Sequence, residues 1–134
     1  MEREKVKPSI VPLDSVEPYE KEVAVTGVKI ARLITRGRSG SELTLGVSWI
    51  GPGERSIWWS SEDKDPGIEG EHWYGPVLET YFCIQGRLRL HWNEGALDFG
   101  PNDAVYLAPG WRYMLENPHD EPAVIVYNMY PSQE

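Results

Sequence analysis

Turn-forming residues interrupt this chain at short intervals. Its 134 residues include 13 glycines and 11 prolines, which exclude long helices because proline removes a backbone donor and both residues punctuate regular structure. Between the turns, apolar and polar residues alternate, most clearly over residues 43–49, where every second residue is apolar. A period of two between regularly spaced turns predicts short strands, and therefore an all-β sandwich or barrel.

The pattern divides the chain into an arm and one domain. Residues 1–22 are highly charged and contain three prolines, which predicts an extended N-terminal arm. The strand pattern begins at residue 23, so residues 23–134 are expected to form a single domain with one core. Within it, the polar stretch 60–76 predicts a loop that is long enough to be functional.

Charge and cysteine content narrow the class of partner and the compartment. Thirteen Lys and Arg against 21 Asp and Glu give a net charge of −8, which disfavours nucleic acid and anionic membrane surfaces. No segment approaches the roughly 18 apolar residues that a membrane span requires. The single cysteine, Cys83, has no partner for an internal disulfide and is expected to pack in the interior. We therefore expect a soluble, cytoplasmic protein that binds a small molecule, with no nucleic-acid or membrane partner.

Residues 72–117 contain a set of spaced residues that a known family shares. In order, these residues are His72, Tyr74, Glu79, Gly86, Pro109, Gly110, Tyr113 and Asn117. The spacing resembles the two signature motifs of the cupin superfamily, in which a His-x-His pair, a Glu and a later His converge inside a double-stranded β-helix. The resemblance covers about residues 43–130 and implies a single-domain cupin with a jelly-roll-like barrel. It also implies a homodimer, formed through the N-terminal arm or an outer sheet face.

Two of the four positions at which cupins carry metal ligands hold tyrosine in this chain. Counted back from Glu79, the first histidine is kept as His72 and the second is Tyr74, while the final histidine position is Tyr113. Phenols bind divalent metals poorly unless they lose a proton. The resemblance leaves His72 and Glu79 as candidate metal ligands, with Glu71 as a third if its loop folds inward. The expected cofactor is therefore either none or a divalent transition metal (Fe, Mn, Ni or Zn).

A second alignment of the motifs stays open at this point. In the family, a Pro-Gly turn precedes the histidine pair by a few residues, and counting from Pro52 and Gly53 ends near residues 58–61. Under this alignment, residues 60–76 are an inserted loop and His72 is a loop residue.

Aromatic residues gather around the same motifs. The chain has six Trp and seven Tyr but two Phe, so most of its rings carry a polar edge suited to a pocket wall. An aromatic lining with few polar groups favours an apolar or aromatic ligand over a sugar phosphate, which would call for Lys or Arg. The expected substrate-binding residues are Trp58, Trp59, Trp73, Tyr81 and Trp111.

Glu79 is the centre of the predicted chemistry. It shares a strand face with Tyr81, and if that face points into the barrel, burial raises the pKa of the carboxyl into the range of an acid–base catalyst. Tyr74 or Tyr113 would orient or polarise a carbonyl, and His72 would be a second titrating group near neutral pH. The predicted catalytic residues are therefore Glu79, His72, Tyr74 and Tyr113.

Three functions are compatible with these residues. The first is a cupin enzyme of the lyase, isomerase or cyclase type, which acts on a small apolar or aromatic carbonyl compound by acid–base chemistry. The second is a metal-dependent cupin, such as a dioxygenase. The third is a ligand-binding or sensory cupin without catalysis. The positions of the predicted residues relative to Glu79 bear on all three.

Overall fold

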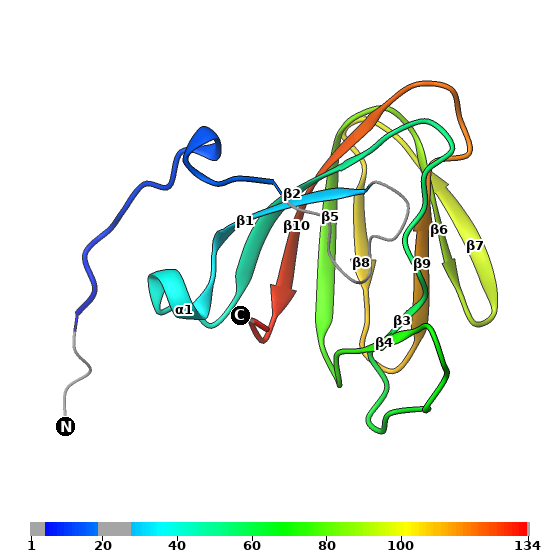
Figure 1. The fold of residues 1–134 in the computed structure, drawn as a ribbon, viewed down its shortest axis with the longest axis horizontal. Helices are drawn as coiled ribbons and strands as arrows, with labels where there is room; N and C mark the ends of the chain where they lie inside the picture. Colours follow the sequence, from blue (N-terminus) through cyan, green and yellow to red (C-terminus); the bar gives the residue numbers. More distant parts are fainter. Residues whose placement is uncertain (1–4, 19–27, 134) are drawn as a thin grey trace.

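The computed structural model describes residues 5–18 and 28–133, which consist mainly of β-strands and connecting turns (Figure 1). The strands of one sheet are β1 (Lys29–Ile34), β2 (Thr44–Ile50), β5 (Leu78–Gln85), β8 (Ala104–Leu107) and β10 (Ala123–Tyr130). The strands of the other are β3 (Trp59–Ser60), β4 (His72–Trp73), β6 (Leu88–Trp92), β7 (Gly95–Phe99) and β9 (Arg112–Glu116). The helical segments are η1 (Leu13–Ser15) and α1 (Arg36–Ser39). None of the helices in these described ranges has the length and apolar character needed to cross a membrane.

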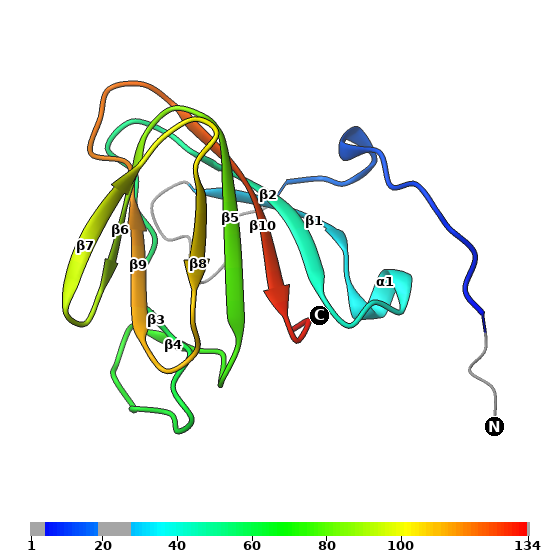
Figure 2. The same cartoon turned by 180° about the vertical axis from the view of Figure 1, so that it is seen from behind.

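Over the described residues each sheet has five strands, and the two sheets form the layers seen in Figures 1 and 2. The first has the order β1-β2-β10-β5-β8, and the second has the order β4-β3-β9-β6-β7. The strand pairs are antiparallel except for β3 with β4, which is parallel. The prediction of an all-β, jelly-roll-like barrel is confirmed.

Alternate residues of β5 point into the space between the sheets. Glu79, Tyr81 and Cys83 are buried, whereas Phe82 and Ile84 on the opposite face are 46% and 53% exposed. The predicted shared face of Glu79 and Tyr81 is confirmed. Cys83 is fully buried, as predicted, and burial raises the pKa of its thiol.

Near the start of the domain, one prediction lies partly outside the described residues and another differs from the structure. The strand expected over residues 23–34 begins at Lys29 in the described part of the chain, and residues 23–27 lie outside it. The expected turn after that strand contains one turn of helix, α1, because Thr35 Oγ1 accepts a hydrogen bond from the backbone N–H of Arg38 at 3.1 Å.

The segment expected as one long loop, 60–76, also contains regular structure. β4 pairs in parallel with β3, with His72 opposite Trp59 and Trp73 opposite Ser60. The backbone N–H of Tyr74 donates to Ser60 O at 2.9 Å and extends this pairing. His72 is therefore a residue of a short edge strand.

Two motif residues have structural roles. Gly86 has a φ of +78°, and a Cβ at this position would lie 2.4 Å from the carbonyl oxygen of Pro122, so the chain requires glycine here. Asn117 is 1% exposed, and its Nδ2 donates to the carbonyls of Ile50 at 3.0 Å and Glu121 at 2.7 Å. These contacts hold the turns at one end of the sheets together.

The described part of the expected arm, residues 5–18, runs away from the two sheets (Figure 1). Val6 and Ile10 in this segment are 78% and 90% exposed. The remainder of the arm, residues 1–4 and 19–22, lies outside the described residues.

Candidate functional site

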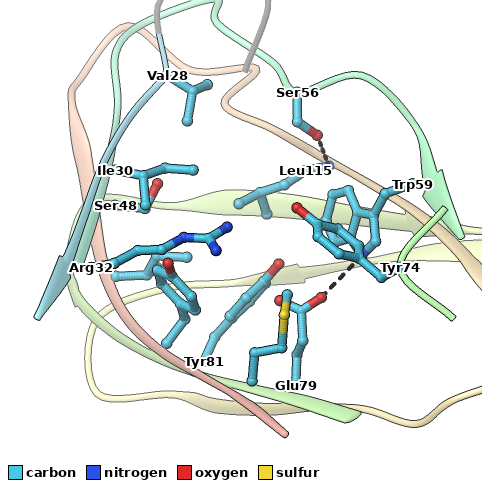
Figure 3. A pocket seen from close by; sticks show the side chains of 13 residues that line it. Val28, Ile30, Arg32, Ser48, Ser56, Trp59, Tyr74, Glu79, Tyr81 and Leu115 are labelled. Atoms are coloured by element: carbon cyan, nitrogen blue, oxygen red, sulfur yellow. Dashed lines mark hydrogen bonds between the residues drawn. The ribbon is translucent and has the colours of Figure 1, made fainter. Parts of the chain in front are cut away.

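A cavity of about 60 Å³ lies between the two sheets (Figure 3). Its walls combine aliphatic and methionine side chains, aromatic rings and four polar side chains. The lining residues are Val28, Ile30, Arg32, Ser48, Ser56, Trp59, Tyr74, Glu79, Tyr81, Leu115, Ile125, Tyr127 and Met129. The cavity is therefore mainly apolar, with a few polar groups that converge on it, as in many small-molecule sites.

Glu79 is the acidic group of the cavity. It is 5% exposed, and its Oε1 accepts a hydrogen bond of 3.0 Å from the indole Nε1 of Trp59 on the opposite sheet (Figure 3). Burial raises the pKa of Glu79 from an ordinary 4.5 to about 7, because desolvation outweighs the lowering effects of this hydrogen bond and of the Arg32 charge. Glu79 can therefore take up or release a proton near neutral pH.

Neutral phenols surround this carboxyl group. Tyr74 and Tyr81 extend their hydroxyl groups into the cavity (Figure 3). Burial raises the pKa of Tyr81 well above its ordinary value, and the neighbouring Glu79 raises it further, so the phenol keeps its proton. The ring of Tyr127 fits into the cavity because position 46 is glycine: a Cβ on Gly46 would lie 2.6 Å from that ring. These hydroxyls can donate hydrogen bonds to a ligand oxygen.

Sequence analysis missed Tyr127 and Arg32, and Arg32 brings a positive charge to the cavity wall. It is 3% exposed, and its guanidinium extends from β1 into the cavity, on the side away from Trp59 and Tyr74 (Figure 3). Arg32 thus adds a cation to a lining that was expected to be aromatic with few polar groups. A signal was present in the sequence, since Arg32 is the one charged residue within the run Ile30 to Ile34 and lies two residues from the inward-facing Ile30.

His72 and Tyr113, two predicted catalytic residues, lie near the site but not among the residues that line the cavity. The His72 ring packs edge-on against Tyr74, with 4.4 Å between the ring centroids. The Tyr113 hydroxyl donates a hydrogen bond to the backbone carbonyl of Ala108. Burial, followed by the nearby Glu79 charge, raises the pKa of Tyr113 to about 12. Of the four predicted catalytic residues, the structure brings Glu79 and Tyr74 together on the cavity wall.

Of the five predicted substrate-binding residues, two line the cavity and three lie outside its lining. Trp59 and Tyr81 line the cavity. Trp58 lies elsewhere, with the Arg112 guanidinium 5.1 Å from its ring centroid. Trp73 is 39% exposed and donates its indole N–H to the Glu62 carbonyl at 2.8 Å, while Trp111 packs against the core outside the cavity lining.

The donor set of the site does not fit the expected divalent metal. In the described ranges, no group of three or more His, Cys, Asp or Glu side chains is placed to hold a metal ion. Glu71, expected as a third ligand beside His72 and Glu79, instead accepts hydrogen bonds from Arg112 Nη2 at 2.6 and 2.7 Å. Tyr113, at the final histidine position, directs its hydroxyl to a backbone carbonyl. We therefore derive no chemistry through a metal.

Solved structures with the same arrangement of strands identify the fold. A predicted oxalate decarboxylase from Thermotoga maritima matches with a TM-score of 0.71 and 14% sequence identity, over 92% of this chain and 99% of that one. A cupin 2 conserved barrel domain protein from Salinispora arenicola matches with a TM-score of 0.64 and 21% identity, over 93% and 90%. Ectoine synthase from P. lautus matches with a TM-score of 0.65 and 16% identity, over 92% and 78%.

The chain has the cupin fold, as its resemblance to the cupin superfamily predicted. No protein-family model matches the sequence, and no curated protein matches it. At identities of 14–21%, the likeness concerns the fold, so an argument for function has to come from the site.

Proposed function

We propose that this protein is a cupin-fold enzyme that moves a proton on a small carbonyl compound, in a reaction of the lyase, isomerase or cyclase type. The observation that carries the proposal is Glu79, a buried carboxyl group on the wall of a mainly apolar cavity, with a pKa of about 7. At neutral pH a carboxyl group with this pKa is present in both its charged and its protonated form, so it can act as a base and as an acid.

The reaction begins with Glu79 as the base. Trp59 holds Oε1, and we assign the proton transfer to Oε2. The carboxylate removes a proton from the carbon next to the carbonyl, and the electron pair of the broken C–H bond moves into the carbonyl to give an enolate. The hydroxyls of Tyr74 and Tyr81 donate hydrogen bonds to the enolate oxygen. Glu79 then returns the proton to a neighbouring atom in an isomerisation, or to a departing group in an elimination.

The chemistry as proposed requires no Fe, Mn, Ni or Zn, because residues of this chain supply the base and the hydrogen-bond donors. The named functions of two structural neighbours, a predicted oxalate decarboxylase and an ectoine synthase, support an enzymatic role for a chain of this fold.

Exchange of carbon-bound protons with solvent tests the proposal. The protein is incubated in D₂O with a panel of carbonyl compounds of three to six carbons, and deuterium incorporation is followed by proton NMR. We expect the wild type to catalyse exchange next to the carbonyl for at least one compound. Glu79→Gln should lower that rate by a factor of 100 or more while ligand binding, measured by calorimetry, persists. Glu94→Gln, which removes an exposed carboxyl group in the β6–β7 turn, is the matched control.

Two outcomes contradict the proposal. Exchange that continues unchanged in Glu79→Gln would remove Glu79 from the chemistry. Binding of a compound without exchange by the wild type would favour the third function, a ligand-binding cupin without catalysis.

A further inference from the structure

The inner face of the first sheet carries a row of functional groups that leads from Arg32 to the strand of Glu79. Backbone pairing places Arg32 opposite Gly46, Gly46 opposite Tyr127, and Tyr127 opposite Tyr81. Three of these residues, Arg32, Tyr127 and Tyr81, line the cavity, and Gly46 makes room for the Tyr127 ring. The row therefore presents a guanidinium followed by two phenols along one side of the cavity.

The guanidinium of Arg32 gives the cavity a positively charged group that a ligand anion can contact. A guanidinium stays protonated throughout the physiological pH range, so the cavity contains a permanent positive charge. Apolar walls at Val28, Ile30 and Leu115 strengthen the interaction between Arg32 and any anion that enters.

The dimensions favour a carboxylate over a phosphate ester. The cavity is about 60 Å³, and Arg32 is the sole Lys or Arg among its described lining residues. A guanidinium matches a planar carboxylate with two parallel hydrogen bonds, whereas a phosphate of higher charge usually recruits further cations. β1 and β5 are separated by β2 and β10, so the Cα atoms of Arg32 and Tyr81 lie roughly 14 Å apart across the sheet. Because the guanidinium of Arg32 enters the cavity from one side, a short carbon chain fits between it and the strand that carries Tyr81.

We propose that the cavity binds a small carboxylic acid, whose carboxylate pairs with Arg32 and whose reacting carbon lies toward Glu79. The binding half of this inference concerns Arg32 alone, and the position of the reacting carbon rests on the proposed function above. It narrows the apolar or aromatic small molecule expected from the sequence to an acid of about four carbons.

Matched acids and amides test the recognition of charge. The probes are butanoate and 2-oxobutanoate, each compared with its amide, and binding is measured by calorimetry at pH 7. We expect the wild type to bind at least one acid ten-fold or more tightly than its amide, because only the acid forms charge-assisted hydrogen bonds. Arg32→Met should remove this preference, Arg32→Lys should retain part of it, and Lys29→Met, an exposed position on the same strand, should leave it unchanged.

The outcomes separate this inference from the proposed reaction. Equal binding of acid and amide by the wild type, or binding of neither, would overturn the inference without any variant having to fold. A preference for acids that persists in a folded Arg32→Met protein would also overturn it. Glu79→Gln should still prefer the acid, so loss of proton exchange in that variant together with retained acid binding would support both proposals independently.

Discussion

The indole N–H of Trp59 donates a hydrogen bond of 3.0 Å to Glu79 across the space between the two sheets. Trp59 lies on β3 of one sheet and Glu79 on β5 of the other. The contact orients the carboxyl group and partly opposes the rise in its pKa, because it stabilises the charged form. It therefore joins the two layers at the atom proposed to carry the chemistry.

Replacing Trp59 with Phe should raise the pKa of Glu79 above about 7, since the variant loses a hydrogen bond to the carboxylate but keeps an apolar ring. Carbon NMR of the side-chain carboxyl groups during a pH titration measures this change. Trp58→Phe, which alters the adjacent residue outside the cavity lining, is the control. An unchanged or lower pKa of Glu79 in Trp59→Phe would show that the indole does not stabilise the charged carboxyl.

Glu79→Gln should become more stable relative to the wild type as the pH rises. The folded pKa of about 7 lies above the ordinary 4.5, so the folded wild type holds a proton that the unfolded chain has released, and it loses stability as the pH rises through this window. The change is at most about 3 kcal/mol between pH 4.5 and 8. Urea unfolding of both proteins across this range measures it. A difference in unfolding free energy that stays constant with pH would contradict the burial of a titrating Glu79.

Gly86→Ala should lower the free energy of unfolding more than Gly53→Ala. Both glycines have positive φ, +78° and +74°, so both substitutions strain the backbone by roughly 1 kcal/mol. A Cβ at position 86 also meets the Pro122 carbonyl at 2.4 Å, whereas one at position 53 meets nothing within 4 Å. We expect an additional loss of about 1–3 kcal/mol for Gly86→Ala, measured by thermal or urea unfolding. Equal losses would mean that the β5–β6 turn relaxes around the new methyl group.

Metal content checks the conclusion about the donor set. The protein purified without chelator should hold less than half an equivalent of Fe, Mn, Ni or Zn by mass spectrometry of the elements, and chelation should leave its melting temperature unchanged. His72→Ala should not alter either result, because in the described part of the chain His72 belongs to no group of three or more side chains placed to hold a metal ion. More than half an equivalent of one metal, lost in His72→Ala, would restore the metal-dependent alternative.

Period-two patterning predicts which residues share a face of one strand. It correctly placed Glu79 with Tyr81 on β5, and it also implies that the adjacent residues Trp58 and Trp59 face opposite ways, although both were expected at the site. The alternation of faces along a strand is therefore compatible with one of these two tryptophans at the cavity, and the structure places Trp59 there.

Local sequence patterns do not predict which strands that are distant in the chain pair with one another. Arg32 and Tyr127 line the same cavity on either side of Gly46 because β2 lies between β1 and β10, an order fixed by the whole barrel. The motif spacing likewise matched Tyr113 to a ligand position but could not show that its hydroxyl bonds to Ala108. Local pattern and resemblance therefore pointed to Glu79, whereas the position of Arg32 on the cavity wall follows from the pairing of distant strands.

Tyr74 contributes to the cavity wall from a position next to an edge strand. It follows β4, which pairs with the two-residue strand β3 at the edge of its sheet, and Glu71 just before β4 is bound to Arg112 of β9. Displacement of this segment would break the pairing of β4 with β3 but would leave the central strands of both sheets paired. We expect the Glu71–Arg112 ion pair, which lies outside the cavity lining, to hold this edge segment in place, so salt or a change at Arg112 should alter exchange rates more than binding affinity.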